Sequence, residues 1–369
     1  MSLLDRVPEY IRSLVPYEPG KPIEEVEREY GIEGSIKLAS NENPLGPSPK
    51  AVKAVAERVS DLHLYPDGDS FYLKRALAAK LGVSQDRLIF GNGSNELIEL
   101  AVRTFMRPGD EAIVAHRAFV IYRLVVQAAG GASKIVPLKD FTHDLEAMAQ
   151  AITPKTRVVF LANPNNPTGT IYRRREFERF LERISAEILL IVDEAYFEYV
   201  GDADYPNSIA YQVYQGEGRT ILTLRTFSKL YGLAGLRIGY AVGPKEIVGL
   251  MQRVRQPFNV NAAAQWAALA ALDDAEHIRR TLEVNREGME YLEREVDKLG
   301  LKRVASQANF ILLRVGDGRA VFEKLLRRGV IVRPMGAYDL PDYIRVTVGT
   351  MMENSRFIEE LKTVVKENE

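Results

Sequence analysis

The sequence Glu187-Ile-Leu-Leu-Ile-Val-Asp193 decides the fold class, because a continuous apolar run of strand length ends there in an acidic residue. Such a run is typical of a strand that is buried on both faces of a parallel sheet. Further runs of this kind lie at 111–115, 134–138, 157–162, 220–224 and 239–243. Helical spacing is clear at 23–30, 50–60 and 71–81, whereas 201–218 is expected to be a loop. Strands that alternate with helices predict an α/β fold, with a mostly parallel sheet covered by helices on both faces.

The pattern changes near residue 262. Residues 262–300 are almost wholly helical, and the runs at 310–314 and 343–348 predict strands of a separate, smaller α+β domain. The first 35 residues are rich in turns and cannot bury a core of their own, so we expect them to lie on the rest of the protein. The expected parts are an N-terminal arm over 1–35, a large domain over 36–262 and a small domain over 263–369.

Composition excludes several classes of function. The net charge of the 369 residues is -1, so no basic excess favours binding to nucleic acid or to an anionic membrane. There is no cysteine, which excludes disulfides and thiolate chemistry, and the four histidines are scattered, so no metal site is predicted. The longest uncharged stretch, 256–272, contains proline and several amides and is a poor membrane span. Charges follow Met1 almost at once, and we expect a cytoplasmic protein.

Ligands of open α/β sheets lie beyond the carboxyl ends of the strands. Two turns at such positions are unusual. The turn Gly91-Asn-Gly-Ser94 leads into a helix whose free N–H groups suit an anion, although, taken alone, a tight turn with a helix cap explains it better. The loop Asn163-Pro-Asn-Asn-Pro-Thr-Gly169 is stiffened by two prolines and holds Asn165 and Asn166 in fixed orientation. Rigid amides of this kind suit the recognition of a polar ligand group.

Two charged residues also follow predicted strands. Asp193 ends the most apolar strand, where a carboxylate needs a cationic partner or serves as a helix N-cap. Lys229 follows an apolar strand and precedes an apolar, glycine-rich loop; most lysines are solvated, but this setting lowers the pKa of an amine and makes it nucleophilic. Ser228 and Arg237 nearby suit an anion. Together these features indicate a cofactor with a phosphate, a basic ring nitrogen and an aldehyde, which are the groups of pyridoxal 5′-phosphate.

The chain resembles the fold-type-I aminotransferases, and closely the histidinol-phosphate aminotransferase family. The resemblance covers nearly the whole sequence. Its motifs are Pro16-Tyr-Glu-Pro-Gly-Lys-Pro22, Ile36-Lys-Leu-Ala-Ser-Asn-Glu-Asn-Pro-Leu-Gly46, Tyr65-Pro-Asp67, the turn at 91–94, the loop at 163–169, Val192-Asp-Glu-Ala-Tyr196, Arg225-Thr-Phe-Ser-Lys229, Gly235-Leu-Arg-Ile-Gly239 and Ile344-Arg-Val-Thr-Val-Gly349. The set is specific for the cofactor class and less specific for the substrate. It implies a pyridoxal-phosphate-dependent transferase of fold type I, with a three-layer large domain and a smaller α+β domain.

The resemblance also implies roles for single residues. Lys229 would carry the cofactor as an imine and move the proton, Asp193 would pair with the pyridine nitrogen, and Phe119 would stack on the ring. Asn166 and Tyr196 would donate to the ring oxygen. The phosphate would be held by Ser94, Asn95, Ser228 and Arg237, and by Tyr65 of a neighbouring subunit, which implies a homodimer with shared sites. The family usually has Pro-Thr before the stacking aromatic, where this chain has Arg117-Ala118.

The substrate residues are expected on the same grounds. Arg345 matches the arginine that binds the substrate carboxylate, and a planar guanidinium suits that group. Arg333 matches the arginine that grips the phosphate of histidinol phosphate, although a surface ion pair is an alternative. Tyr17 of the arm is expected to close over the substrate, and Asn43 to contact it.

The function expected from this resemblance is amino transfer between L-histidinol phosphate and 2-oxoglutarate, with imidazole acetol phosphate and glutamate as the other pair, in histidine biosynthesis. One alternative is an aromatic amino-acid aminotransferase, and another is a pyridoxal-dependent decarboxylase acting on threonine phosphate. A transcription regulator built on this fold needs an N-terminal DNA-binding domain, and the arm before residue 36 is too short for one.

Overall fold

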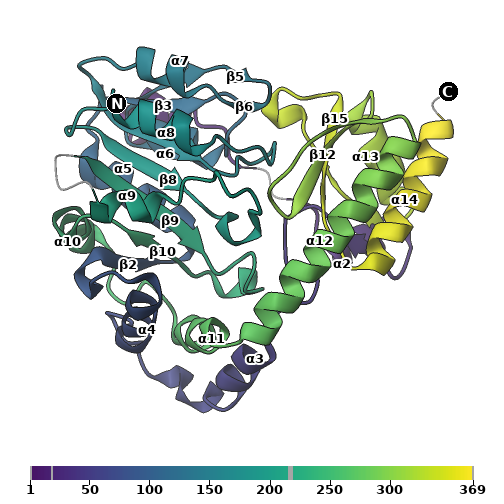
Figure 1. The fold of residues 1–369 in the computed structure, drawn as a ribbon, viewed down its shortest axis with the longest axis horizontal. Coiled ribbons are helices and arrows are strands. Elements are labelled where there is room, and N and C mark those ends of the chain that lie inside the picture. The colour runs from purple at the N-terminus through teal and green to yellow at the C-terminus, as the bar shows by residue number, and fades with distance from the viewer. Residues whose placement is uncertain (1, 18–19, 215–218, 368–369) are drawn as a thin grey trace.

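The large domain is built on a seven-stranded sheet. The computed structural model describes residues 2–17, 20–214 and 219–367, and Figure 1 shows a large domain joined to a smaller one. Along the sheet, the strands are β2 (Leu88–Gly91), β10 (Gly239–Val242), β9 (Thr220–Thr226), β8 (Leu189–Asp193), β7 (Thr156–Ala162), β3 (Glu111–Ala115) and β4 (Ala132–Val136). All neighbouring pairs from β9 to β4 are parallel, whereas β10 runs antiparallel to both β2 and β9. The expected mostly parallel sheet is therefore confirmed.

Helices cover the sheet and give the large domain its layers (Figure 1). The helices are α3 (Pro49–Ala56), α4 (Phe71–Leu81), α5 (Gly93–Phe105), α6 (Ile121–Ala128), α7 (Leu145–Gln150), α8 (Arg174–Leu181), α9 (Ser208–Tyr214), α10 (Lys245–Val254) and α11 (Ala262–Leu272). Buried residues of α5, α6, α7, α8 and α10 form one core with the central strands, and a second core joins α3, α4 and α11 to the β2–β10 edge. A short hairpin, β5 (Leu138–Lys139) and β6 (Thr142–His143), lies outside the main sheet.

Two expected elements differ from the structure. The helix expected over 50–60 ends at Ala56, and a 3-10 turn over Val59–His63 follows it. The segment 201–218 is not wholly a loop, because α9 occupies part of it and packs on β9; residues 215–218 lie outside the described residues. The sequence of α9 is rich in β-branched and aromatic residues, which are weak helix formers, so the helix depends on tertiary packing.

The small domain is an antiparallel sheet packed against long helices. Its strands, in order, are β11 (Lys302–Val304), β12 (Phe310–Arg314), β15 (Tyr343–Thr347) and β14 (Arg333–Pro334). Its helices are α12 (Ala275–Lys298), α13 (Gly318–Arg327) and α14 (Met351–Lys366). None of the helices in the described part of the chain is both long enough and apolar enough to cross a membrane.

The expected domain boundaries need correction at both ends. Strand β1 (Ile36–Lys37) pairs with β13 (Val330–Ile331), and Leu38 lies in the small-domain core, so residues 36–38 belong with the small domain. Helix α11 packs on α3 and α4 and belongs with the large domain, so the boundary falls before α12 rather than at residue 263. Figure 1 shows α12 running from the large domain into the small one.

The N-terminal arm lies on both domains. Helix α1 (Glu9–Arg12) lies on α6, where Gln127 Nε2 donates to the Tyr10 carbonyl at 3.1 Å. Helix α2 (Ile23–Tyr30) buries Val26 against Leu326 and Ile331 of the small domain. The arm thus passes from one domain to the other.

A buried ion pair connects the ends of β8 and β9. Glu194 directly follows β8, and its side chain is fully buried. It accepts from Arg225 Nη2 at 2.7 Å and Nε at 3.0 Å, and its other oxygen accepts from the Ser208 amide at 2.9 Å. Because both charges are out of water, each depends on the other for its solvation.

We predict that Arg225→Met lowers the free energy of unfolding by about 3–5 kcal/mol, because it leaves the Glu194 carboxyl buried without its cationic partner. Chemical denaturation at neutral pH measures the change. The matched control is Arg286→Met, which breaks an ion pair with Glu290 that is exposed on both sides and costs at most about 1 kcal/mol. Equal losses in the two variants would contradict this reading of the buried pair.

Candidate active site

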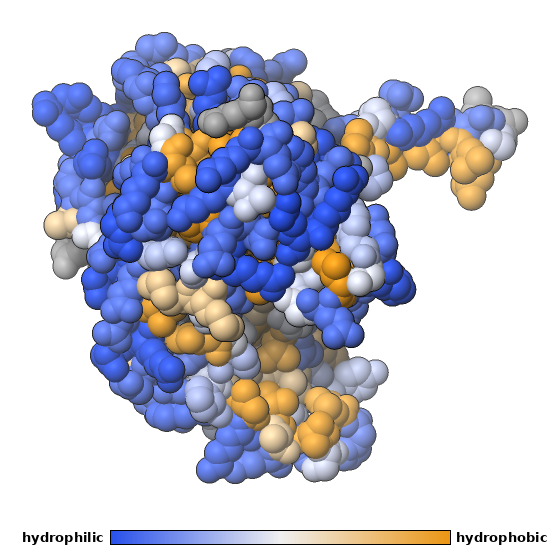
Figure 2. Space-filling view, turned by 90° about the vertical axis from the view of Figure 1, so that its right-hand side faces the viewer, coloured by the Kyte–Doolittle hydropathy of each residue, from blue (hydrophilic) through white to orange (hydrophobic). Residues whose placement is uncertain are grey.

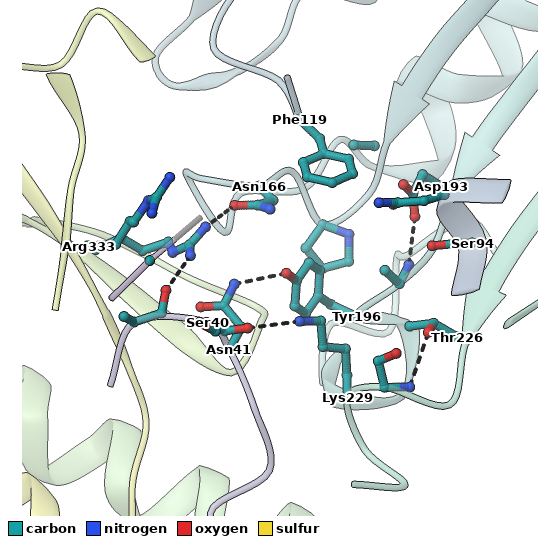
Figure 3. Close-up of a pocket in the computed structure, with 18 of the residues that line it drawn as sticks. Ser40, Asn41, Ser94, Phe119, Asn166, Asp193, Tyr196, Thr226, Lys229 and Arg333 are labelled. Atoms are coloured by element: carbon teal, nitrogen blue, oxygen red, sulfur yellow. Dashed lines mark hydrogen bonds between the residues drawn. The ribbon is translucent and has the colours of Figure 1, made fainter. Parts of the chain in front are cut away.

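A cavity of about 230 Å³ lies where the arm, the large domain and the small domain meet. Strands β7, β8 and β9 direct the residues at their carboxyl ends toward it, as expected for an open α/β sheet. Figure 3 shows Asp193 and Ser94 at one end of the cavity and Arg333 at the other, with Lys229 and Asn166 between them. The arrangement offers one subsite at the sheet and a second subsite at the small domain.

Lys229 is a partly buried amine inside this cavity. It follows β9, and its Nζ donates to the Ser40 carbonyl at 3.0 Å. Burial, together with the nearby Arg345 and Arg237 guanidinium groups, lowers the pKa of Lys229 from 10.5 to about 8. The sequence-based expectation of a lysine with a lowered pKa is confirmed. A substantial fraction of the amine is therefore neutral and nucleophilic near neutral pH.

Asp193 is a buried carboxylate that faces the cavity. Tyr122 donates its hydroxyl to Asp193 Oδ2 at 2.6 Å, and the Ala195 amide donates to Oδ1 at 3.1 Å. Burial raises the pKa of Asp193, and these two hydrogen bonds oppose that rise. No salt bridge to Asp193 is found among the described residues. A protonated ring nitrogen in the cavity would supply the missing cation.

The end of the cavity beside Asp193 is a cradle for an anion. Helix α5 begins at Gly93, and Ser94 and Asn95 of its first turn line the cavity. A Cβ at Gly93 would collide with the Arg237 guanidinium, and one at Gly239 would lie 2.6 Å from the Ser94 amide. The two glycines therefore let a cation and a helix N-terminus approach the same point, which is the arrangement that binds phosphate.

Ser228 and Thr226 complete this cradle on the side of β9. Ser228 is buried and lines the cavity, and its amide donates to Thr226 Oγ1 at 3.1 Å. Phe119 lines the cavity near Asp193 and meets Tyr122 edge-on, with ring centroids 5.7 Å apart. A flat ring between Phe119 and the sheet would place its nitrogen at Asp193 and its phosphate at Ser228, so the residues fit pyridoxal phosphate.

Polar groups from three segments meet on the other side of Lys229. Tyr196 accepts from Asn41 Nδ2 at 2.8 Å, and burial raises the pKa of its hydroxyl to about 12. Arg345 donates from Nη2 to the Ala39 carbonyl at 2.8 Å and from Nη1 to Asn166 Oδ1. These contacts connect the loop after β7 to the start of the large domain and to β15 of the small domain.

Two arginines form the small-domain wall of the cavity. Arg345 in β15 lies directly opposite Arg333 in β14, so both guanidinium groups reach the same cavity. Burial lowers the pKa of Arg345, and its Nε has no hydrogen-bond partner among the described residues. Arg333 lies 5.8 Å from the ring centroid of Tyr17 in the arm. Two cationic forks beside a nucleophilic lysine suit a substrate with two anionic groups.

Known proteins are similar to this chain in sequence and in fold. The family model described as aminotransferase class I and II matches residues 33–361. The histidinol-phosphate aminotransferase of Moorella thermoacetica is 51% identical over 358 residues, which are 97% of this chain and 92% of that protein. Histidinol-phosphate aminotransferase 1 of Nitrosococcus oceani is 49% identical over 97% of this chain and 96% of its own length.

This chain belongs to the histidinol-phosphate aminotransferase family. Among solved structures, histidinol-phosphate aminotransferase from Sinorhizobium meliloti in complex with pyridoxal-5′-phosphate is similar, with a TM-score of 0.90 and 27% sequence identity. The match covers 99% of this chain and 98% of that one. The predicted family and fold class are therefore confirmed.

Most residues expected from the family resemblance line the cavity together. They are Tyr17, Ser94, Asn95, Phe119, Asn166, Asp193, Tyr196, Ser228, Lys229, Arg237, Arg333 and Arg345. Phe119 lies as expected although Arg117-Ala118 precedes it. The Arg117 carbonyl accepts from Asn165 at 3.2 Å and its guanidinium donates to the Asp339 carbonyl at 3.1 Å, so this departure from the family pattern links the two domains.

Two expected residues lie elsewhere. Asn43 does not line the cavity, because its amide donates to the Leu230 carbonyl at 2.8 Å and to Thr281 Oγ1 at 3.1 Å. The interpretation of Asn43 as a substrate ligand is therefore wrong, and Asn41 in the same motif lies at the cavity instead. Tyr65 is 84% exposed and stacks on Phe258, away from the cavity of its own chain.

Several cavity residues were missed by sequence reasoning: Ser40, Asn41, Tyr122, Thr226 and Tyr338. Thr226 and Asn41 stand inside quoted motifs, so their position was a usable signal. Tyr122 lies three residues after Phe119, which precedes α6, and its amide donates to the Phe119 carbonyl at 3.2 Å, so the short spacing in the sequence was a usable signal. Tyr338 lies in a short 3-10 turn of the small domain, and nothing in its sequence surroundings indicates that it reaches the site.

We predict that apoprotein forms its covalent bond to pyridoxal phosphate at a rate that rises with pH and levels off just above pH 8. Below its pKa of about 8, Lys229 is protonated and cannot attack an aldehyde. Stopped-flow absorbance across the pH range measures the rate. A rate that keeps rising to pH 10, as it would for a solvated lysine, would contradict the lowered pKa. Lys229→Ala is the control, because it lacks the amine and should show no such reaction.

Proposed function

We propose that this enzyme transfers an amino group between L-histidinol phosphate and 2-oxoglutarate, a step of histidine biosynthesis. The observation that carries the proposal is the pair Arg333 and Arg345, two guanidinium groups on neighbouring strands that face the cavity of Lys229. The relatives named histidinol-phosphate aminotransferase, 45–51% identical over nearly the whole chain, support it. One arginine suits the phosphate of histidinol phosphate, and both suit the two carboxylates of glutamate.

The protein is a pyridoxal-phosphate-dependent aminotransferase. When bound, the cofactor supplies an electron-withdrawing pyridinium that stabilises negative charge at the carbon next to the substrate nitrogen. The proposed cofactor contacts follow from the cavity. Asp193 would keep the ring nitrogen protonated, Phe119 would cover the ring face, and Asn166 and Tyr196 would donate to the ring oxygen. The phosphate would be held by Ser94, Asn95, Ser228 and Arg237.

The proposed chemistry of the chain itself centres on one amine. Lys229, with a pKa of about 8, would take the proton from the substrate Cα as a neutral base and would deliver it, as the resulting acid, to the cofactor carbon bonded to the same nitrogen. Arg345 orients the substrate carboxylate of the glutamate half-reaction through its buried fork. Tyr17 at the mouth of the cavity lies over Arg333 and would exclude water when substrate is bound.

A homodimer with shared sites extends this proposal. Tyr65 and its apolar neighbours are exposed: Val59, Leu62, Leu64 and Phe258. Figure 2 shows hydrophobic side chains gathered on the lower part of the molecule, where α3 lies in Figure 1. A large exposed apolar surface favours association with a partner. We propose that a second copy covers it and receives the Tyr65 hydroxyl at its cofactor phosphate. A cytoplasmic location stays a prediction.

We predict that the enzyme turns over imidazole acetol phosphate with glutamate far faster than it turns over phenylpyruvate. Arg333→Gln should raise KM for imidazole acetol phosphate by about 10- to 100-fold, because a charge-assisted contact to the phosphate is lost. KM for phenylpyruvate should stay unchanged. Steady-state kinetics of both substrates measure this. Preference for phenylpyruvate in the unchanged enzyme would favour an aromatic aminotransferase, and carbon dioxide release from threonine phosphate would favour a decarboxylase.

Subunit mixing tests the shared site. We predict that Lys229→Ala and Tyr65→Ala are each impaired, and that refolding the two together restores activity. In the mixed dimer, one site combines an intact Lys229 with an intact Tyr65 from the other copy. If Tyr65 served its own subunit, no site would be complete and mixing would restore nothing. Mixing Lys229→Ala with Asp193→Ala is the control, since both residues belong to one cavity; the mixed dimer stays inactive.

A further inference from the structure

Tyr122 is a buried cavity residue that the proposed chemistry does not use. It stands at the start of α6, and only 1% of it is exposed. Its hydroxyl donates to Asp193 Oδ2 at 2.6 Å, which is a short bond between a neutral donor and a carboxylate. The only other hydrogen bond to the Asp193 carboxylate among the described residues comes from the Ala195 amide.

Packing holds the ring of Tyr122 in one place. It stacks on Phe160 of β7 with centroids 4.7 Å apart and an interplanar angle of 10°. It also meets the ring of Phe119 edge-on, with centroids 5.7 Å apart and an interplanar angle of 88°. One tyrosine therefore contacts both the ring expected to cover the cofactor and the carboxylate expected to face the ring nitrogen.

Burial and the hydrogen bond between Tyr122 and Asp193 act in opposite directions on the pKa of Asp193. Burial raises the pKa of Asp193, so a dry cavity favours the protonated carboxyl, which could not attract a pyridinium. The Tyr122 hydrogen bond acts against this rise. Burial and the nearby Asp193 raise the pKa of Tyr122 well above its usual value, so its hydroxyl keeps its proton and remains a donor.

We propose that Tyr122 is a positioning residue for the cofactor. Its hydroxyl keeps the Asp193 carboxylate charged and directed at the ring nitrogen, and its ring packs edge-on against Phe119 and holds that side chain in place. The inference rests on the proposed function, because it needs a pyridine nitrogen at Asp193. Tyr122 acts through Asp193 and Phe119 rather than on the substrate, so its loss should affect the chemical step more than substrate binding.

The test compares Tyr122→Phe with Tyr172→Phe. Tyr172 is a second tyrosine buried in the same core, and it does not line the cavity. Tyr122→Phe keeps the ring and its packing and removes only the donor. We expect kcat to fall by about tenfold or more, with KM nearly unchanged, because a hydrogen bond to a charged group is lost. Tyr172→Phe should leave both unchanged.

A spectroscopic readout separates positioning from a general structural effect. Without the Tyr122 hydroxyl, Asp193 carries less negative charge and the cofactor ring less positive charge. The lysine nitrogen bonded to the cofactor then holds its own proton to higher pH. The pH midpoint of the bound cofactor's absorbance should therefore move up by about one unit in Tyr122→Phe and not in Tyr172→Phe.

A double variant tests whether Tyr122 works through Asp193. In an Asp193→Asn background, Tyr122→Phe should change neither the midpoint nor kcat further, because the two residues act as one unit. Additive losses, or an unchanged midpoint in Tyr122→Phe with wild-type kcat, would overturn the inference. Failure of the proposed function looks different, since the unchanged enzyme itself would then show no cofactor absorbance or no amino transfer.

Discussion

Asp193 and Lys229 come from the ends of neighbouring parallel strands, β8 and β9, and both lose water when the chain folds. Desolvation raises the pKa of the Asp193 carboxyl and lowers that of the Lys229 amine to about 8. In both groups it therefore favours the neutral form over the charged form. The free energy of this desolvation is offset by the apolar packing of β8 and β9 in the core of the large domain. Burying Asp193 and Lys229 costs free energy, and this cost has a function only if a ligand binds between the two groups.

The small domain contributes the two arginines that we propose select the substrate of this cavity. Its sheet contributes Arg333 and Arg345, and the β1–β13 pairing ties the motif containing Ser40 and Asn41 to the same domain. Arg345 contacts Ala39 and Asn166, so the residue proposed to bind the substrate carboxylate shares a hydrogen-bond network with one proposed to bind the cofactor.

Sequence reasoning predicted the elements whose signal is local. Helices α2 and α4 and strands β3 and β12 have the expected bounds, because periodicity and turn residues define them. The direction of β10 and the helix α9 were not predictable in this way, since tertiary packing decides both. At the site, Lys229 and Asp193 were identifiable from apolar strands that end in a charge. Asn43 was chosen wrongly over Asn41, because only the left-handed backbone of Asn41 and its contact with Tyr196 decide which amide faces the cavity.

The central claim is that the amine at position 229 is the one that bonds the cofactor aldehyde. Borohydride reduction of the holoenzyme, followed by proteolysis and mass spectrometry of the peptides, tests it directly. We expect a single phosphopyridoxyl adduct on Lys229, in a peptide that carries Thr226 and Ser228. An adduct on another lysine, or protein that stays unmodified after incubation with pyridoxal phosphate, would contradict it.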